Sequence, residues 1–185
     1  MKLKMKTRKI ITMIAAGCMF LCSCMKEQLE VTYNKQEDQI SKYIESALNK
    51  NPEYTHTNNK GANRLTLVQG DGEELSASGS ITFYYAGYTF NGSLSIANMF
   101  ITNRKESADD ARWDLTDFSF EPLTINLKDD ELLNGLKNGL TGVKAGEECE
   151  ILFSGKYGFG KRPFGIIPAN SALLYKIWVI SISND

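Results

Sequence analysis

The side chains best suited to chemistry in this chain are aromatic and apolar rather than ionisable. The segment YGFGKRPFGIIPANSALLYKIWVISI, Tyr157 to Ile182, places glycines, prolines, aromatic rings and isoleucines in a loop that is followed by a strand. Apolar side chains in a loop need a reason, because connecting segments normally run over the surface and stay polar. These side chains either pack into the core or line a site for an apolar ligand, and the residue pattern alone leaves both readings open.

Ionisable groups offer little chemistry by comparison. His56 is the only histidine and lies in a polar run, so a zinc site built from His and Cys is not expected. The paired carboxylates Asp109-Asp110 and Asp129-Asp130 are typical of a solvated loop or of the first turn of a helix, where negative charge suits the helix dipole. We expect no metal and no cofactor.

The N-terminus, MKLKMKTRKIITMIAAGCMFLCSC, has the order of a secretory signal: basic residues, an apolar run from Ile10, then small residues and cysteines. The run is shorter than the roughly 20 residues that a transmembrane helix needs. Its ending, LCSC, resembles a bacterial lipobox, which predicts a signal peptide over residues 1–23 and a lipid on Cys24. Lipidation at Cys18 and an uncleaved anchor helix are the two alternatives.

Removal of such a signal changes the charge and the cysteine inventory. The whole chain has 21 Lys and Arg against 22 Asp and Glu, and loss of the leading basic residues gives a mature chain of about −6. An acidic domain without a basic patch argues against nucleic-acid binding. Cys149 remains as the free thiol and is expected to be a small buried hydrophobe on a strand.

The elements that must position the apolar residues begin with a helix. The segment 24–59 is predicted to contain a polar tether and then an amphipathic helix over residues 35–50. That helix carries apolar side chains at helical spacing: Ile40, Tyr43, Ile44, Ala47 and Leu48. Asn51-Pro52 ends it, because the residue before a proline is pushed out of the helical region.

Short strand-like runs separated by turn signals follow, which is typical of an antiparallel sheet. They cover residues 64–69, 79–92, 93–103, 120–127 and 147–154, and a last run ends at Ile182, with Asn91-Gly92 as a hairpin signal. The last run places Leu173, Tyr175, Ile177 and Val179 on one face. The charged segment 104–117 is expected to be a loop.

One short helix is predicted within DDELLNGLKNGLTGVKAGE, where Leu132, Leu136, Leu140 and Val143 form one apolar stripe. Five or six strands with one short helix against one face make an α+β layer architecture. The residues from Lys60 onward suffice for one core and not for two. We predict three parts: the signal 1–23, the tether and helix 24–59, and a domain over 60–185.

Several motifs, in order, resemble the FKBP-type peptidyl-prolyl cis-trans isomerases from about Arg64 to Ile182. They are FYYAGYTFNG on a strand, LLNGLKNGLTGVKAGE at the short helix, the YGFG turn at 157–160, and GIIPAN at 165–170. The lipobox setting resembles exported lipoproteins of this family. The resemblance implies an FKBP-like curved antiparallel sheet of five to six strands wrapping one short helix, preceded by an N-terminal helix.

The resemblance also implies an enzyme that isomerises X-Pro bonds and assists the folding of exported proteins in the cell envelope. The implied catalytic residues are Tyr85, Phe100, Phe159, Ile167 and Tyr175. The implied substrate-binding residues are Leu123, Leu132, Leu133 and Leu136, with the Leu133 backbone N–H meeting a substrate carbonyl. Isomerisation needs no nucleophile, because the barrier of roughly 18–20 kcal/mol comes from amide resonance.

Four positions differ from the family pattern. Ile101 stands where an aspartate is usual, Phe159 where a tyrosine is usual, Leu136 where a tryptophan is usual, and Tyr175 where a phenylalanine is usual. Two polar groups are thereby lost, while the apolar character is kept. We predict a proline-binding pocket with reduced isomerase efficiency and weaker binding of macrolide inhibitors.

Two other classes of function stay open: a non-catalytic chaperone or adaptor that binds proline-containing segments, and a structural lipoprotein. The expected partners are proline-containing proteins and, through the lipid, a membrane. Methionine rather than aspartate follows Cys24, which by analogy with lipoprotein sorting favours the outer membrane. Trp113 or Phe118 is a further hypothesis for an extended peptide-binding surface, with a packed surface loop as the alternative.

Overall fold

The structure, a computed structural model, describes the backbone of residues 3–115 and 118–184 and the side chains of residues 26–115 and 118–184. The chain divides into two units, Met1–Lys35 and Gln36–Asp185. The expected signal 1–23 and the lipidation site Cys24 lie outside the residues whose side chains are described. Within the described residues, no helix is long and apolar enough to span a bilayer.

Helix α1 (Leu3–Lys50) contains the predicted helix over residues 35–50 and begins earlier. The segment 25–34, expected to be a polar tether, is therefore helical, and its Lys, Glu and Gln residues are good helix formers. The helix ends directly before Asn51-Pro52, as predicted. Its last part belongs to the unit that holds the strands, where Ile40 and Ile44 are buried.

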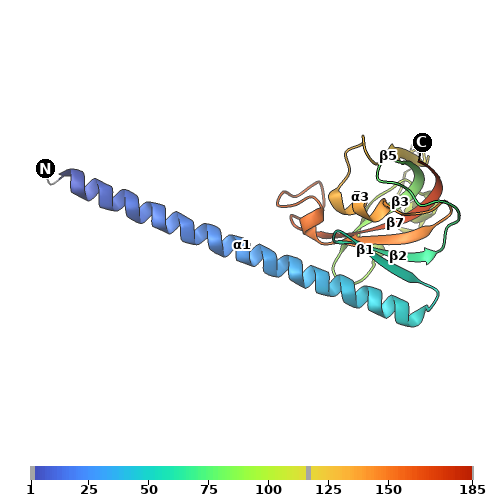
Figure 1. Cartoon of the computed structure of the whole chain (residues 1–185), viewed down its shortest axis with the longest axis horizontal. Helices are drawn as coiled ribbons and strands as arrows, with labels where there is room; N and C mark the ends of the chain where they lie inside the picture. The colour runs from blue at the N-terminus through green and yellow to red at the C-terminus, as the bar shows by residue number, and fades with distance from the viewer. Residues whose placement is uncertain (1–2, 116–117, 185) are drawn as a thin grey trace. The chain divides into compact units, whose positions relative to one another are not determined.

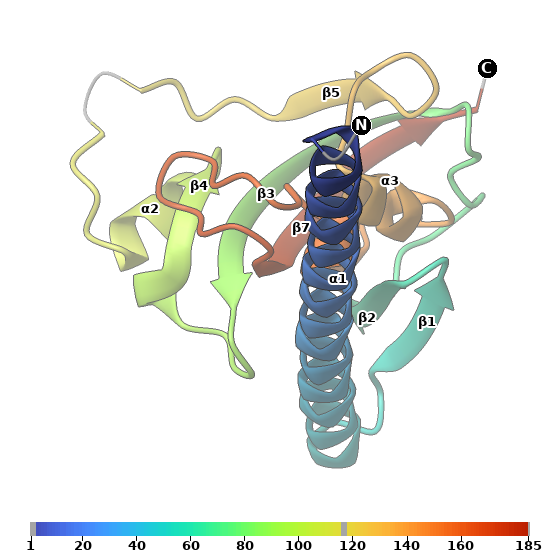
Figure 2. The same ribbon diagram turned by 90° about the vertical axis from the view of Figure 1, so that its left-hand side faces the viewer.

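A seven-stranded antiparallel sheet forms the body of the unit 36–185. Its strands are β1 (Thr55–Asn59), β2 (Ala62–Val68), β3 (Ser80–Phe90), β4 (Met99–Thr102), β5 (Leu123–Asn126), β6 (Glu148–Phe153) and β7 (Ala172–Ser183). The order is β1-β2-β6-β7-β3-β4, and β5 pairs with the start of β3 (Figure 2).

The expected α+β class is confirmed, with more strands than the predicted five or six. The additional strand β1 lies in the polar run around His56, which shows no apolar alternation, and forms a hairpin with β2. Strands β3 and β4 pair as expected, but residues 91–98, including a 3₁₀ turn at Ile96–Asn98, connect them. Asn91-Gly92 thus opens a longer connection rather than a two-residue hairpin.

Helix α3 (Asn134–Leu140) is the predicted short helix, and it lies against one face of the sheet (Figure 1). Glycines allow this close approach. A Cβ atom added at Gly135 would lie 2.2 Å from the Phe153 ring, and one at Gly139 would lie 2.2 Å from Cγ2 of Ile151. Any larger residue would push the helix away from β6.

Arg64 on β2 fixes the C-terminal end of α3. Its guanidinium donates hydrogen bonds to the carbonyl oxygens of Gly139 at 3.1 Å, Thr141 at 2.9 Å and Gly142 at 3.2 Å. A cation suits the last carbonyls of a helix because they are unpaired and partially negative. The carboxylate of Glu147, 3.3 Å from Nε, holds the guanidinium in place from its other side.

The two faces of the sheet have separate cores. On the face that α3 covers, which we call the α3 face, Leu173, Tyr175, Ile177 and Val179 of β7 point inward. This is the face predicted from their alternation. On the opposite face, which we call the α1 face, Leu174 packs against Ile40 and Ile44 in a second core. One strand thus serves two cores.

The charged segment 104–117, expected to be a loop, contains a short helix, α2 (Lys105–Asp110). Its exposed pair Lys105–Asp109 has the i, i+4 spacing that supports a helix. Trp113, which follows α2, packs against the core of the α1 face. That contact gives the tryptophan a structural role in an otherwise charged segment.

Candidate functional site

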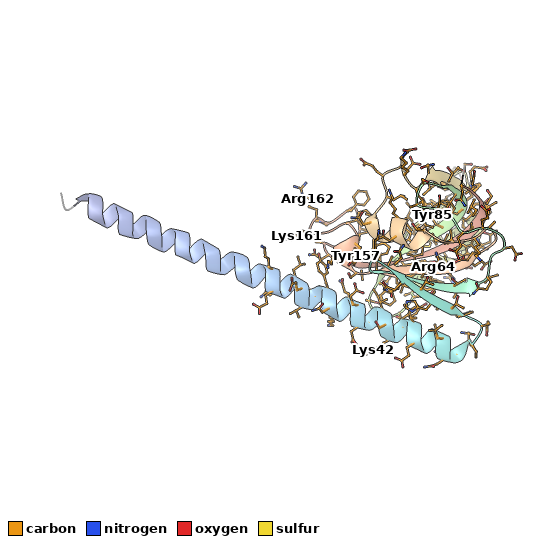
Figure 3. All side chains as sticks on the ribbon, viewed as in Figure 1. Lys42, Arg64, Tyr85, Tyr157, Lys161 and Arg162 are labelled. Atoms are coloured by element: carbon orange, nitrogen blue, oxygen red, sulfur yellow. The ribbon has the colours of Figure 1, made fainter. Side chains whose placement is uncertain are left out.

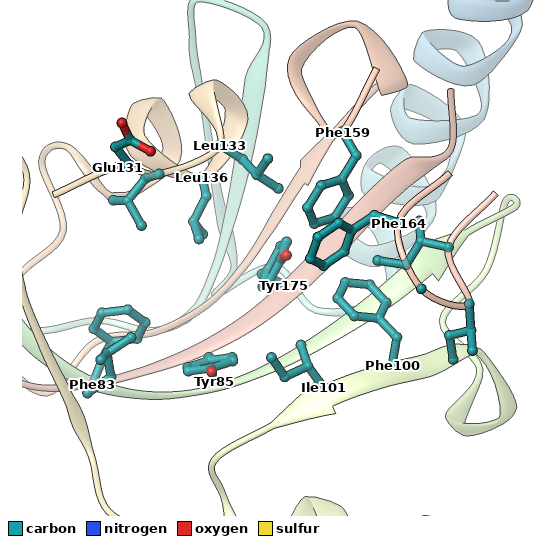
Figure 4. Close-up of a pocket in the computed structure, with 15 residues that line it drawn as sticks. Phe83, Tyr85, Phe100, Ile101, Glu131, Leu133, Leu136, Phe159, Phe164 and Tyr175 are labelled. Atoms are coloured by element: carbon teal, nitrogen blue, oxygen red, sulfur yellow. The ribbon is translucent and has the colours of Figure 1, made fainter. Parts of the chain in front are cut away.

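An apolar cavity of about 480 Å³ opens on the α3 face (Figure 4). The structure brings together in its lining all nine residues that the sequence predicts: Tyr85, Phe100, Leu123, Leu132, Leu133, Leu136, Phe159, Ile167 and Tyr175. The remaining lining residues are Phe83, Ile101, Glu131, Phe164, Gly165 and Ile166. The cavity is therefore built from two central strands, the start of α3, β4, β5 and the loop before β7.

The innermost wall of the cavity comes from aromatic residues on neighbouring strands. Tyr175 of β7 is only 6% exposed and lies opposite Gly87 of β3 in the sheet register. Its ring stacks on Phe153 with centroids 6.1 Å apart and meets Phe100 edge-on at 5.9 Å. These contacts hold the Tyr175 ring in one orientation at the centre of the cavity (Figure 4).

Two polar residues that follow or end β4 fix the backbone at Tyr85. The Thr102 hydroxyl donates to the Tyr85 carbonyl at 2.7 Å, and the Tyr85 N–H donates to the Asn103 side-chain oxygen at 2.6 Å. The Asn103 amide nitrogen also donates to the Glu121 carbonyl at 3.0 Å. Asn103 thereby ties β3 to the segment that leads into Leu123, another residue of the lining.

The start of α3 supplies the aliphatic side of the cavity. Leu133 is the N-cap residue, and Leu136, one turn into the helix, is 8% exposed. Both side chains reach the cavity with Leu132. Glu131, directly before them, is the one charged residue among the lining residues described. The cavity therefore suits an uncharged ligand.

Residues 155–170, within the loop 154–171 between β6 and β7, form the remaining wall, and we call them the flap. Phe159 and Phe164 stack face to face within it, with centroids 4.7 Å apart and planes 5° apart. Phe164 and Ile167 exchange two backbone hydrogen bonds of 3.0 and 2.9 Å. The apolar loop residues noted in the sequence thus form a folded wall, while Lys161 and Arg162 project outward (Figure 3).

Sequence reasoning misses part of the cavity mouth. Phe164 and Ile166 are 63% and 78% exposed. Both lie in the flap, where no periodicity marks a face. Ile101 of β4, which is 39% exposed, lines the cavity, as expected from its position after Phe100 in the family pattern. Phe83, also missed, has a detectable signal, because it lies two residues before Tyr85 on the same strand and so shares its face.

Two hydroxyl groups are the distinctive polar atoms of the cavity. Burial raises the pKa of the Tyr85 hydroxyl, and it raises the pKa of the Tyr175 hydroxyl still further, with a smaller contribution from Tyr85. Both hydroxyls are therefore neutral near pH 7. Neither has a hydrogen-bond partner among the described residues, so both remain free to donate to a bound ligand.

The hypothesis of a wider binding surface concerns Trp113 and Phe118. Neither residue lines the cavity described above. Trp113 is half-buried against the α1 face, and Phe118 is 48% exposed and packs edge-on against Phe120 at 5.1 Å. A role for either residue in peptide binding stays a prediction.

Comparison with known proteins places these observations in a family. Residues 80–180, more than half of the chain, match the family model described as FKBP-type peptidyl-prolyl cis-trans isomerase. FK506-binding protein 1 of Aspergillus oryzae is 21% identical over 123 residues, covering 66% of this chain and 99% of that protein. An FK506-binding protein of Neisseria meningitidis is 26% identical over 117 residues, covering 63% of this chain and 91% of that protein.

Solved structures give the same fold. FkpA of Escherichia coli aligns with a TM-score of 0.55 at 19% identity, covering 94% of this chain and 71% of that chain. A multi-domain immunophilin of Arabidopsis thaliana aligns with a TM-score of 0.54 at 18% identity, covering 71% of this chain and 46% of that one. At these identities the likeness shows the fold alone.

Proposed function

Because the chain belongs to the family of FKBP-type peptidyl-prolyl cis-trans isomerases, we propose that it isomerises X-Pro bonds in exported proteins and so assists their folding. The observation that carries the proposal is the apolar cavity, which holds all nine residues expected at such a site. Tyr85, Phe100, Phe159, Ile167 and Tyr175 would act on the bond. Leu123, Leu132, Leu133 and Leu136 would hold the substrate.

Such a cavity can lower the isomerisation barrier without acid, base or nucleophile. The planar amide is strongly polar because of its resonance, and the twisted amide at the barrier has lost much of that resonance. A dry apolar cavity therefore disfavours the planar form relative to the twisted form. This is preferential binding of the transition state, and each 1.36 kcal/mol so gained speeds the reaction about tenfold.

The two free hydroxyls supply hydrogen-bond donors, which the apolar rings lack. A substrate bound against Tyr85 and Tyr175 brings its backbone carbonyls into a cavity whose other walls offer few donors. A hydroxyl that donates to such a carbonyl fixes the twist of the neighbouring bond. Tyr175 is the better placed of the two, because its ring is held on two sides by Phe153 and Phe100.

The proposal includes a lower efficiency than is usual in the family, together with weaker binding of macrolide inhibitors. Phe159 and Ile101 carry no hydrogen-bonding group on the side chain, although both face the cavity. The pocket is apolar at these two positions and lacks two polar contacts that are usual in the family. A substrate would then be held mainly by burial of its apolar surface.

We further propose that the protein acts at the cell envelope, anchored by a lipid on Cys24 after removal of residues 1–23 and located in the outer membrane. The order of basic, apolar and cysteine residues at the N-terminus supports export and the lipid anchor, and the methionine that follows Cys24 favours the outer membrane. Mass spectrometry of the membrane-extracted protein tests it. A diacylglyceryl-modified N-terminal cysteine at residue 24 is expected, and an unmodified N-terminal Met1 would exclude the anchor.

Proline-limited refolding of a substrate protein tests the enzyme directly. The purified protein should accelerate the slow refolding phase, and Tyr85→Ala and Phe159→Ala should each remove most of that acceleration. Ser41→Ala, on the exposed side of α1, is a matched control and should leave the rate unchanged. Acceleration that survives both cavity substitutions would place the activity elsewhere.

A non-catalytic chaperone or adaptor is the second candidate. The exposed apolar residues at the cavity mouth favour it, since Phe164 and Ile166 could hold an unfolded segment without any bond rotation. Peptide binding that depends on Tyr85, in a protein without any effect on the refolding rate, would support the adaptor and exclude the enzyme.

A further inference from the structure

One side-chain amide holds both ends of the flap. The Oε1 atom of Gln36 accepts a hydrogen bond from the N–H of Gly155 at 2.9 Å. The Nε2 atom of the same residue donates to the carbonyl oxygen of Asn170 at 2.7 Å. Gly155 follows the end of β6 by two residues and Asn170 precedes the start of β7 by two, so the two bonds bracket the flap.

The two ends of the flap lie close together where Gln36 forms its hydrogen bonds. A Cβ atom added at Gly155 would lie 2.2 Å from the Asn170 carbonyl oxygen, which shows that the two ends of the flap are in contact. Asn170 has a φ of 58°, a left-handed conformation that asparagine tolerates better than most residues. Its N–H donates to the Gly160 carbonyl at 2.7 Å, which carries the constraint into the loop.

The cavity depends on the position of this loop. Phe159, Phe164 and Ile167 lie between the two flap ends that bond to Gln36, and all three line the cavity. Ile167 is only 3% exposed and packs in the core of the α3 face. A change in the width of the flap at its base would therefore move an entire wall of the cavity relative to Tyr85 and Tyr175.

We propose that Gln36 is a positioning residue of the site, an amide clamp by which α1 sets the flap. The inference rests on the proposed function and deepens it. The residue lies outside the matched region 80–180, and it links the cavity to the helix that covers the other face of the sheet. A displacement of residues 36–50 of the helix would therefore move the flap, and with it one wall of the cavity, through these two hydrogen bonds.

The helix offers a matched control in Gln39. Its Nε2 atom also donates to a loop carbonyl, that of Asn91 at 3.5 Å, but that loop does not line the cavity. Both glutamines are partly buried on the same helix. Gln36→Met and Gln39→Met each remove an amide while keeping a side chain of similar length and helix propensity.

The test combines amide hydrogen exchange with turnover of a tetrapeptide that contains one Phe-Pro bond, both on the full chain. Gln36→Met should speed exchange of the flap amides at least fivefold and lower kcat/KM three- to tenfold, chiefly through kcat. Gln39→Met should change neither. The melting temperatures of the two variants should agree within a few degrees, because neither substitution removes core packing.

Two outcomes would overturn the clamp. One is unchanged flap exchange in Gln36→Met, and the other is an equal loss in both variants, which would indicate a general weakening of the helix. The exchange measurement does not require catalysis. If the wild-type protein proves inactive, faster flap exchange together with weaker tetrapeptide binding in Gln36→Met still supports the clamp, while the proposed isomerase fails separately.

Discussion

The two faces of one sheet differ in how completely they are covered. On the α1 face, residues 36–50 of the helix close a core in which Ile40 is fully buried. On the α3 face, a seven-residue helix covers only part of the strands, and the uncovered part is the cavity. Neighbouring residues of β7 fall on opposite faces, with Leu174 in the closed core and Tyr175 at the cavity.

This difference separates stability from function along a single strand. A side chain buried in the core of the α1 face, unlike Gln36 at the flap, meets protein on all sides, so its loss should weaken the fold and leave the chemistry intact. A side chain at the cavity meets protein on one side and ligand on the other, so its polar atoms can be changed at little cost to folding. If the two faces were not separable in this way, substitutions in the core of the α1 face would lower activity as well as stability.

The largest effect on stability is expected from Ile40→Ala. Removal of a fully buried isoleucine side chain costs about 2–5 kcal/mol of unfolding free energy. Isomerase activity, measured well below the melting temperature, should stay within twofold of wild type. Urea denaturation measures the first quantity, with Ser41→Ala as the exposed control. A large loss of activity in a folded Ile40→Ala protein would contradict the separation of the faces.

Gly135→Ala should affect both stability and activity, because it acts at the contact between α3 and β6, next to the cavity. The new Cβ would lie 2.2 Å from the Phe153 ring, which in turn stacks on Tyr175. Overpacking of this kind costs about 1–3 kcal/mol, which should outweigh the gain of about 1 kcal/mol from alanine in a helix.

Denaturation and turnover of the Phe-Pro tetrapeptide check this prediction together. The neighbouring exposed residue offers a control, and Asn134→Ala should change the unfolding free energy by less than about 0.5 kcal/mol. A Gly135→Ala protein that is as stable and as active as wild type would show that α3 can move without disturbing the cavity.

Tyr175→Phe is expected to change catalysis and spare the fold. One neutral hydrogen bond is worth about 0.5–1.5 kcal/mol, so kcat/KM should fall roughly three- to tenfold. The unfolding free energy should be unchanged or slightly higher, because the hydroxyl has no partner within the described part of the chain. Equal turnover by Tyr175→Phe and wild type would show that the Tyr175 hydroxyl does not contribute to catalysis.

The smallest effect is a pH dependence that arises on the α1 face. Burial raises the pKa of Glu150, although the hydrogen bond from the Tyr43 hydroxyl at 2.7 Å and the charge of Lys176 oppose the shift. A carboxyl whose folded-state pKa is raised binds more protons in the folded state. Its favourable contribution is present below the unfolded pKa of about 4.3 and is lost as the pH rises through the raised folded value.

Glu150→Gln should therefore gain stability relative to wild type as the pH rises across this window, and the difference should level off above it. Denaturation of the two proteins at a series of pH values measures the difference between their unfolding free energies. Isomerase activity should show no matching change, since Glu150 does not line the cavity. A difference in unfolding free energy that is constant with pH would show that folding does not shift the pKa of Glu150.

The sequence predicted the residues of the cavity better than the elements around it. Alternation along the last strand placed Tyr175 on the correct face, and family motifs located residues as far apart as Tyr85 and Ile167. The roles of these residues stay predictions. Helix α2 was missed because its residues are charged and show no apolar stripe, and β1 was missed because its residues are polar.

What the sequence could not give are contacts that depend on two distant segments. Nothing in the polar residue Gln36 indicates that its amide bridges Gly155 and Asn170, more than a hundred residues away. Likewise, the exposure of Phe164 and Ile166 follows from the folding of the flap rather than from any periodic pattern. Long-range polar contacts and irregular loops carry the least local signal.

Exchange spectroscopy by NMR on a Phe-Pro tetrapeptide is the sharpest test of catalysis in the cavity, because it measures the rate of bond rotation itself. A catalytic amount of the wild-type protein should raise the cis–trans exchange rate far above the uncatalysed rate. Tyr85→Ala at the same concentration should return it close to that rate. An exchange rate that the wild-type protein does not alter, despite tetrapeptide binding in the cavity, would show that the cavity binds the X-Pro segment without isomerising it.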